Sequence, residues 1–314
     1  MRFKLSVQSA IFRFYPLELA VQKIADAGFD GIELWGGQFH GYYLDFLTEG
    51  SSLADRRLDG EKIAFVKKLV DKAGLEIVCY TPEQCFYPIN YLATDIQPFS
   101  SEENRTKSLD CFKLSIDIAA ALETRKVVVT TPFWLWKKGE SGGFRMMNKV
   151  ETLKKAEQIL KELTDYAEKR DVTLLLEPLS HLETTAVETL DETVATLDAI
   201  DSPNLQAMLD TGHINITATK LGRDPTKYLI EHVNKLNGRI AHVHIDDNFG
   251  DVDAHLVPGE GNINFKPFLN ALEQNGYSGY LSIELAVFGN YPIPPTPETL
   301  IRKSRQFLIN ATGS

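Results

Sequence analysis

Residues 242–255 read HVHIDDNFGDVDAH, with three histidines and four aspartates in fourteen positions. Imidazole and carboxylate groups at this density can hold a metal ion, and they are also common in solvated polar turns. The segment alone does not decide between a metal site and a polar loop. The decision depends on acidic residues elsewhere in the chain that could share one site with these histidines.

Four apolar segments with the composition of strands end in an acid or a histidine. Side chains alternate between the two faces of a strand, so their parity shows which residues face away from the covering helices. The residues that parity turns inwards are Glu177 in LLLEP, Asp210 in QAMLD, His242 and His244 in IAHVHI, and Ser282 and Glu284 in YLSIEL. Because a buried carboxylate without a partner is costly, convergence of these acids at one rim would require a compensating cation.

One divalent ion would supply that charge. Glu177, Asp210, His244 and Glu284 form an oxygen-rich ligand set that suits Mn²⁺ first, with Mg²⁺, Co²⁺ or Zn²⁺ as alternatives. Such a set leaves coordination positions open, which is typical of a catalytic site. The alternative is four separate hydrogen-bonded polar residues, and their matched positions on successive strands disfavour it.

Two other inward residues are expected to have supporting or binding roles. His242 lies one step deeper than His244 and is expected to support a ligand or to pack in the interior. Glu33 faces inwards on an earlier strand, where it could bind a substrate or accept a hydrogen bond from a neighbouring buried donor. The sequence leaves these two roles of Glu33 open.

The strand ends can meet only if the strands share one sheet. Apolar runs bounded by turn residues predict strands at 4–9, 31–36, 76–81, 126–131, 172–178, 205–210, 240–245 and 280–285. An amphipathic helix is predicted after each, the last within the C-terminal segment 296–314. Strict alternation predicts an α/β fold, a (β/α)8 TIM barrel formed as a single domain by residues 1–314. No G-x-G-x-x-G follows the first strand, which disfavours an open doubly wound sheet.

Composition and charge limit the classes of binding partner and the cellular compartment that we expect. The chain has 33 basic and 43 acidic residues, a net charge of −10, which disfavours nucleic acid. No window approaches the roughly 18 apolar residues of a spanning helix, so no membrane partner is expected. Three scattered cysteines and an N-terminus without a secretory pattern predict a cytoplasmic protein.

The two terminal glutamates suggest a reaction. The strands of Glu177 and Glu284 are three apart in an eight-stranded ring, so the carboxylates would reach a bound molecule from well-separated directions. A metal that binds a ketone oxygen and the neighbouring hydroxyl would acidify the C–H between them and stabilise a cis-enediolate. If one glutamate removes the proton and the other returns it from the far side, the carbon is inverted.

Nearly the whole chain resembles the xylose-isomerase-like barrel superfamily, and within it the ketose 3-epimerases. The segments LLLEPLSHLE, MLDTGHIN, HVHIDDN, LVPGEGNI and LSIEL stand where the D-tagatose and D-psicose 3-epimerases keep their metal ligands. GIELWGGQFH, YTPEQCFYPIN and the D-x-H before PGEG are similar to fructoselysine 3-epimerase. The resemblance implies a small sugar substrate, a ketose or fructosamine-type sugar epimerised at C3. It also implies that Glu177 and Glu284 are both metal ligands and acid/base groups, and that the chain forms a homodimer or homotetramer.

The same resemblance assigns substrate contacts. Glu183 and His213 match positions that bind substrate hydroxyls in the tagatose-type enzymes. The alternatives are that Glu183 is an acid of a surface loop and that His213 is a loop histidine. His255 stands where the tagatose-type enzymes have an arginine, and with Asp253 it is expected to shape the pocket or, as in endonuclease IV, to bind a second metal. Three other acids of the opening segment are expected to be solvated loop residues: Asp246, Asp247 and Asp251.

Three long loops are expected to surround the site, at 37–57, 82–100 and 132–147. Their aromatic residues could stack on a sugar: Trp35, at the end of its strand, with Phe39, Tyr42, Phe86, Trp134 and Trp136. Three basic residues could meet a phosphate or be merely solvated: Lys137, Lys138 and Arg145.

Other functions remain as alternatives. An enediolate can expel a β-hydroxyl, as in the inosose dehydratases, which would make the protein a lyase. A phosphodiesterase like endonuclease IV is disfavoured, because that enzyme has histidines where this chain has Tyr80, Thr81, Thr130 and Thr131. A sugar-binding protein without turnover is the third alternative, since a fold alone does not determine activity.

Overall fold

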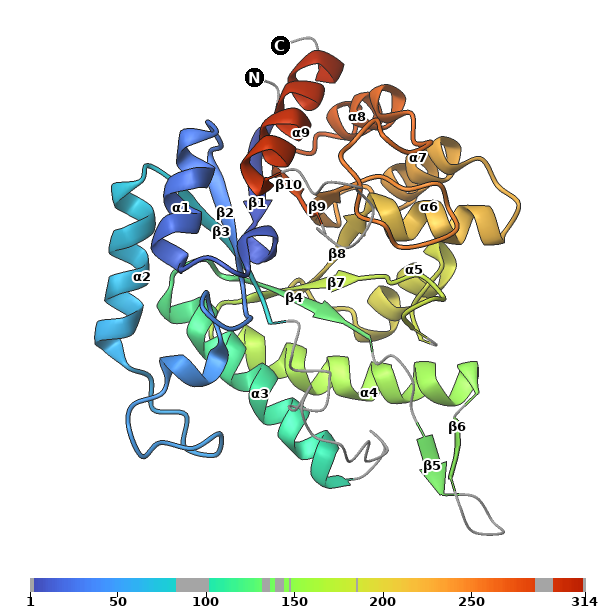
Figure 1. The fold of residues 1–314 in the computed structure, drawn as a ribbon. Coiled ribbons are helices and arrows are strands. Elements are labelled where there is room, and N and C mark those ends of the chain that lie inside the picture. The colour runs from blue at the N-terminus through green and yellow to red at the C-terminus, as the bar shows by residue number, and fades with distance from the viewer. Residues whose placement is uncertain are drawn as a thin grey trace.

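Eight parallel strands close into a barrel in the computed structural model (Figure 1), which describes residues 3–82, 102–131, 136–138, 144–146, 148–184, 186–285 and 296–312. The order around the barrel is β1-β10-β9-β8-β7-β4-β3-β2. The strands are β1 (Lys4–Gln8), β2 (Gly31–Trp35), β3 (Glu76–Thr81), β4 (Lys126–Thr130), β7 (Thr173–Glu177), β8 (Leu205–Asp210), β9 (Ile240–Ile245) and β10 (Tyr280–Ile283). The predicted (β/α)8 barrel is therefore confirmed.

Helices form the outer layer, as Figure 1 shows. They are α1 (Leu17–Asp26), α2 (Gly60–Lys72), α3 (Glu102–Ala121), α4 (Lys149–Glu168), α5 (Leu190–Ile200), α6 (Thr211–Lys220), α7 (Pro225–Lys235), α8 (Phe265–Gln274) and α9 (Pro297–Thr312), with short 3-10 turns η1 (Ser9–Phe12) and η2 (Tyr43–Phe46). Capping boxes begin α4 and α5, in which Asn148 and Thr189 bond the helix N-termini. Helix α9 contacts α8 and α1, so the last helix closes the ring beside the first.

The sequence prediction missed one helix and one hairpin. Strand β8 is followed by two helices, because α6 precedes the expected α7. All eight residues from Thr211 to Ala218 in α6 are buried, so the segment lacks the polar face by which periodicity reveals a helix. A short antiparallel hairpin, β5 (Trp136–Lys138) and β6 (Phe144–Met146), lies within the expected loop 132–147.

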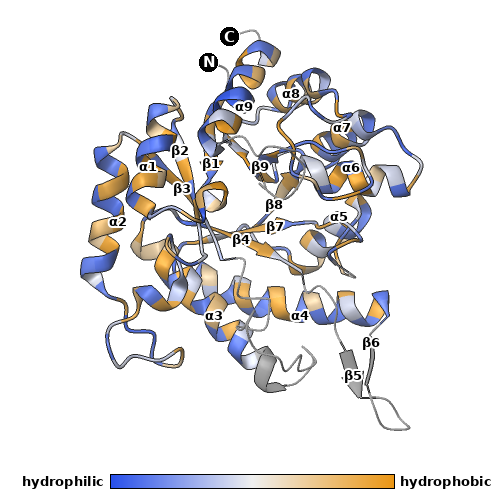
Figure 2. Ribbon diagram, in the orientation of Figure 1, coloured by the Kyte–Doolittle hydropathy of each residue, from blue (hydrophilic) through white to orange (hydrophobic). Residues whose placement is uncertain are grey.

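Hydrophobic residues fill two layers. The larger layer lies between the strands and the helices, whose ribbons alternate between apolar and polar residues in Figure 2. The smaller cluster, Val78, Cys79, Val128, Leu175 and Met208, fills the barrel. Polar side chains replace apolar ones towards the C-terminal ends of the strands, which is where a TIM barrel builds its site. Within the described residues, none of the helices combines the length and hydrophobicity that a membrane-spanning segment requires.

Candidate active site

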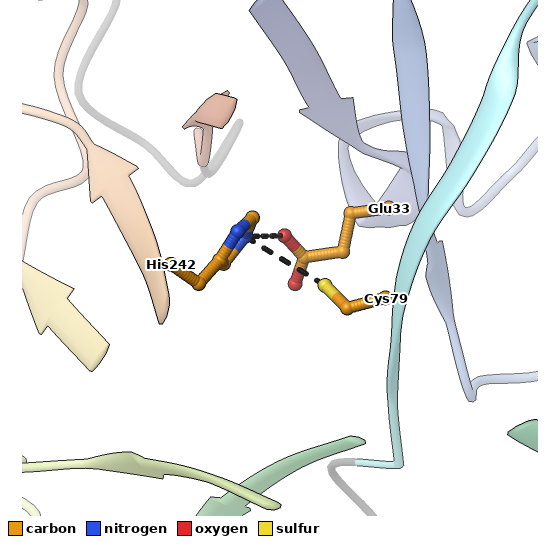
Figure 3. Close-up of side chains that lie close together, drawn as sticks. All are labelled: Glu33, Cys79 and His242. Carbon is orange, nitrogen blue, oxygen red and sulfur yellow. Dashed lines mark hydrogen bonds and ion pairs between the residues drawn. The ribbon is translucent and has the colours of Figure 1, made fainter. Parts of the chain in front are cut away.

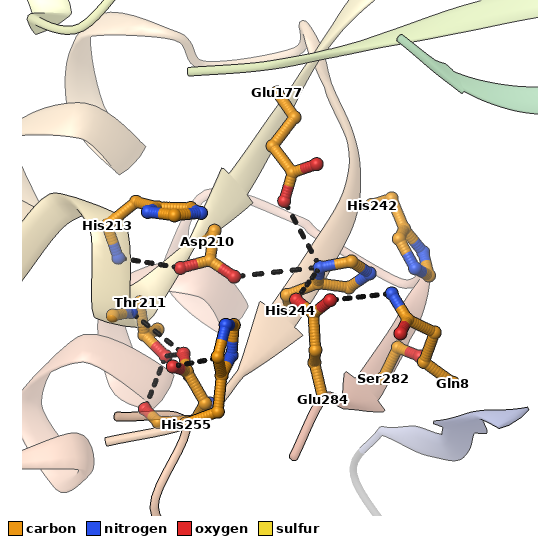
Figure 4. Close-up of polar contacts among 12 residues, drawn as sticks. Gln8, Glu177, Asp210, Thr211, His213, His242, His244, His255, Ser282 and Glu284 are labelled. Carbon is orange, nitrogen blue, oxygen red and sulfur yellow. Dashed lines mark hydrogen bonds and ion pairs between the residues drawn. The ribbon is translucent and has the colours of Figure 1, made fainter. Parts of the chain in front are cut away.

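Four predicted metal ligands lie at the ends of four neighbouring strands (Figure 4). Glu177 ends β7, Asp210 ends β8, His244 lies one residue before the end of β9, and Glu284 follows β10. In the strand register, His244 is paired with Asp210 on one side and with Ser282 on the other. Because Ser282 and Glu284 share a face of the chain, this register brings Glu284 towards His244.

The three carboxylates surround one nitrogen of the imidazole. His244 Nδ1 is 3.3 Å from Glu177 Oε1, 3.6 Å from Asp210 Oδ2 and 2.6 Å from Glu284 Oε2. One ligand atom from each of the four residues lies within 4.8 Å of the others. Ligand atoms at about 2.1 Å from one octahedral ion are about 3 Å apart when adjacent and about 4.2 Å apart when opposite. The spacing of the quartet fits one such ion.

Unbonded polar atoms also fit a cation. Among the described residues, neither Asp210 Oδ2 nor His244 Nδ1 has a hydrogen-bond partner of good geometry, although both atoms are buried. Buried polar atoms nearly always have a hydrogen-bond partner. Two unpaired buried atoms that face one another therefore indicate a ligand between them. Carboxylate oxygens with one imidazole nitrogen form a donor set that suits Mn²⁺ or a similar divalent ion.

Asp210 is held in place by helix α6. Its Oδ1 accepts a 2.7 Å hydrogen bond from the backbone N–H of His213 and so caps the helix. This bond leaves Oδ2 turned towards His244. Burial alone would favour the neutral acid, but the imidazoles of His213 and His244 hold the pKa of Asp210 at about 2. The cap therefore presents a charged oxygen to the centre of the quartet.

Glu284 is positioned from the opposite side by Gln8, whose Nε2 donates a 2.7 Å hydrogen bond to Oε1. Burial raises the pKa of Glu284 to about 8, against the attraction of His244. Burial would lower the pKa of His244, but Glu284 and Glu33 raise it well above its usual range. The acids around His244 therefore favour a positive charge at the centre of the quartet. The sequence analysis missed Gln8, although its inward parity at the end of the first strand could have revealed it.

The quartet opens into a pocket with a water-accessible volume of about 180 Å³. The polar residues that line it are Gln8, Glu177, Glu183, His213, Asp253, His255 and Glu284, together with Thr81 and Thr130. Glu183, His213 and Asp253 bring ligand atoms within 4.8 Å of one another, and so do Asp246, Asp253 and His255. Burial raises the pKa of Glu183 to about 7. The predicted substrate-binding residues Glu183, His213 and His255 therefore share one cavity with the quartet, and His213 lies in α6 rather than in a loop.

Glu33 and Trp35 lie elsewhere. Glu33 is fully buried beneath the quartet and accepts hydrogen bonds from protein donors, including both imidazoles of β9 at 2.9 Å. Those imidazoles hold the pKa of Glu33 well below its usual range although burial would raise it. The ring of Trp35 meets that of His40 edge-on at 6.0 Å. Neither Glu33 nor Trp35 is among the described residues that line the pocket.

The expectation that Asp246 and Asp247 are solvated is wrong, because both are fully buried. Asp246 Oδ1 accepts from Gly212 N at 2.8 Å, and Asp247 Oδ2 accepts from Gly259 N at 2.9 Å. Backbone N–H groups from distant segments thus replace water around these carboxylates. Asp251 is exposed, as expected.

The structure does not describe several side chains that were expected to surround the site. Phe86 and Trp134 lie outside the described residues, as do the side chains of Trp136, Lys137, Lys138 and Arg145.

The ends of β3 and β4 carry Tyr80, Thr81, Thr130 and Thr131. These residues offer hydroxyl groups where the three-metal site of endonuclease IV would need imidazoles.

Comparison with known proteins finds sugar-converting enzymes among the similar proteins. A fructoselysine 3-epimerase from Shigella flexneri is 30% identical over 270 residues, 86% of this chain and 85% of that protein. An inosose dehydratase from Clostridium tetani is 32% identical over 117 residues, 32% of this chain and 37% of that protein. The crystal structure of a D-tagatose 3-epimerase-like protein matches with a TM-score of 0.72 at 25% identity, covering 99% of this chain and 97% of that one.

The family model described as xylose isomerase-like TIM barrel matches residues 21–311. This chain belongs to that family, as its strand-end motifs predicted.

Proposed function

We propose that this protein is a divalent-metal-dependent sugar epimerase that inverts C3 of a ketose or of a fructosamine-type sugar. The proposal is carried by the convergence of Glu177, Asp210, His244 and Glu284, whose ligand atoms lie within 4.8 Å of one another. The similarity to a fructoselysine 3-epimerase over most of both chains supports a sugar as the substrate class.

Glu177, Asp210, His244 and Glu284 would hold the cation, for which Mn²⁺ is the first candidate. When bound, the cation supplies positive charge that offsets the negative charge developing on the carbonyl oxygen as C3 loses its proton. Asp210 keeps one oxygen for this role because α6 occupies the other.

The two glutamates move the proton. Strands β7 and β10 are separated by β8 and β9, so the carboxylates of Glu177 and Glu284 approach a sugar in the pocket from different directions. One glutamate accepts the proton of C3, and the other donates a proton to the opposite face of the planar enediolate. The roles exchange when the other epimer is the substrate, so the reaction is reversible.

Glu183, His213 and His255 are proposed to bind sugar hydroxyls, because they line the same pocket as the two glutamates. Carboxylate and imidazole groups can accept from or donate to a hydroxyl, and several such contacts would orient C3 between the glutamates. Glu33 and Trp35 are left out of this set, because neither is among the described residues of the pocket wall.

The test is a panel of ketoses, ketose phosphates and fructosamines incubated with the Mn²⁺-loaded protein in D₂O. The proposal predicts deuterium at C3 and the C3 epimer of at least one compound, both abolished by a chelator. Absence of deuterium from every compound, with bound metal verified, would contradict it.

Dehydration is the second candidate, favoured by the partial similarity to an inosose dehydratase. The same deprotonated sugar can lose a β-hydroxyl if the second glutamate protonates the leaving group instead of carbon. A product lighter by one water in the same panel would replace the epimerase assignment with a lyase.

A further inference from the structure

Glu33 occupies the interior of the barrel directly behind the predicted metal ligands. It lies on β2 and is fully buried, and its side chain extends across the barrel towards β9. Figure 3 shows its carboxylate facing His242, with Cys79 beside it. A carboxylate in this position needs strong donors, because burial without them would be prohibitive.

Donors from four other strands converge on Glu33. His242 Nε2 lies 2.9 Å from Oε2, His244 Nε2 lies 2.9 Å from both oxygens, and Ser282 Oγ donates to Oε2 at 2.8 Å. Thr81 Oγ1 donates to Oε1, and Gln8 Nε2 makes a longer contact with the same oxygen at 3.5 Å. A carboxylate has about four acceptor positions, so these five donors occupy it. No position on Glu33 is left for a substrate hydroxyl.

The bond to His244 determines which imidazole nitrogen is protonated. Because Nε2 faces the Glu33 carboxylate, Nε2 carries the hydrogen and donates it. The other nitrogen, Nδ1, faces Glu177, Asp210 and Glu284 and needs its lone pair if it is to bind a cation. An anionic acceptor behind an imidazole also raises the basicity of the ligating nitrogen.

We propose that Glu33 is a positioning residue, which fixes the Nε2–H tautomer and the orientation of His244 so that Nδ1 can bind the metal. This proposal rests on the proposed metal site. Ser282 supports the same arrangement: it bonds Glu33 and is paired in register with His244. His242 supports it too, since its ring packs edge-on against that of His244 at 5.4 Å while donating to the same carboxylate.

The first test compares Mn²⁺ affinity by isothermal titration calorimetry in the wild type and in Glu33→Gln. An amide is a weaker acceptor and turns an N–H towards one of the converging donors, so we expect about a 10–100-fold weaker affinity. Glu188→Gln is the matched control, because Glu188 is also a buried acid but bonds Lys220 at 2.9 Å. The control should bind Mn²⁺ like the wild type. Equal affinity of Glu33→Gln and the wild type would overturn the proposal.

The second test is independent of turnover and of metal. In ¹⁵N-histidine-labelled protein, the His244 Nε2–H should give a low-field proton resonance that Glu33→Gln shifts or abolishes and Glu188→Gln preserves. Ser282→Ala removes one donor without removing the acid, so it should lower the Mn²⁺ affinity less than Glu33→Gln while keeping the resonance. If Glu33→Gln does not fold, Ser282→Ala serves as the test, and a Mn²⁺ affinity equal to that of the wild type would then overturn the proposal.

The outcomes separate the two proposals. If the wild type binds no divalent ion, the proposed function fails, and the resonance alone reports on Glu33. If the wild type binds Mn²⁺ and the resonance is unchanged in Glu33→Gln, the metal site stands and Glu33 has no positioning role.

Discussion

Gln8 Nε2 donates a 2.7 Å hydrogen bond to Glu284 Oε1, which ties the end of the first strand to the residue that follows the last. The other oxygen of Glu284 then lies 2.6 Å from His244 Nδ1. Closure of the barrel between β1 and β10 is what makes this contact available. One acid/base candidate therefore depends on an amide that is remote from it in sequence.

Replacing Gln8 with Ala should lower kcat of the proposed epimerase by roughly tenfold. One hydrogen bond to a charged group contributes about 1.5 kcal/mol, and losing it lets the Glu284 carboxylate rotate away from C3. The matched control is Ser6→Ala on the same strand, since Ser6 Oγ has no partner among the described residues. Steady-state kinetics of both variants test this, and similar rates for Gln8→Ala and the wild type would contradict it.

Replacing Gly212 with Ala should destabilise the fold by about 1–3 kcal/mol, as overpacking does. A Cβ at Gly212 would lie 2.2 Å from Asp246 Oδ2, and that carboxylate is buried and bonded to Gly212 N. Gly60→Ala is the control, because its Cβ would meet nothing within 4 Å. Urea unfolding should separate the two variants, and equal midpoints would show that Asp246 can move.

His232 should make the fold sensitive to mild acid. Burial lowers its pKa to about 4, whereas in the unfolded chain it would be about 6.5. Between these values the unfolded state binds the extra proton, so stability is present above pH 6.5 and falls as the pH drops towards 4. The loss amounts to about 3 kcal/mol.

The test of this pH dependence is urea unfolding of the wild type and of His232→Gln at pH 7 and pH 4. The stability advantage of the wild type over the variant should shrink by about 3 kcal/mol at the lower pH. An advantage that does not change with pH would contradict the assignment. The comparison between the two proteins cancels the contribution of the acidic site.

The two glutamates should have opposite stereochemical roles. Glu177→Gln and Glu284→Gln should each lower epimerisation by about 10²–10⁴-fold, because each loses one proton-transfer group. The remaining glutamate can still exchange the C3 proton of one epimer with D₂O without converting it. NMR should show deuterium entering one epimer in the first variant and the other epimer in the second.

Asp251→Asn is the control for these variants, because Asp251 is an exposed acid in the loop that follows β9. The metal content of each variant should be measured alongside, so that loss of the ion is not mistaken for loss of a base. Exchange into the same epimer in both glutamate variants would refute the division of roles.

Parity along single strands was enough to predict that the four proposed metal ligands converge. Glu177, Asp210, His244 and Glu284 each end or follow an apolar run, and parallel strands bring such ends to one rim. The same rule applied to KLSVQ would have placed Gln8 beside them. The (β/α)8 barrel followed from the alternation of strands and helices in the same way.

Features that depend on distant segments could not be predicted. Asp246 and Asp247 look like loop acids until the N–H groups of Gly212 and Gly259 are placed beside them. Helix α6 lacks an exposed face, so its sequence has no helical periodicity. The environment of Glu33 depends on donors from β1, β3, β9 and β10, which only the closed barrel brings together.

The central claim is that four residues bind one divalent cation at the C-terminal ends of the barrel strands. The most direct measurement is anomalous diffraction from crystals of the Mn²⁺-loaded protein, collected at the manganese absorption edge. We predict a single strong peak in contact with Glu177, Asp210, His244 and Glu284. A peak only beside Glu183, His213 and Asp253, or none near Glu177 and Glu284, would contradict the account.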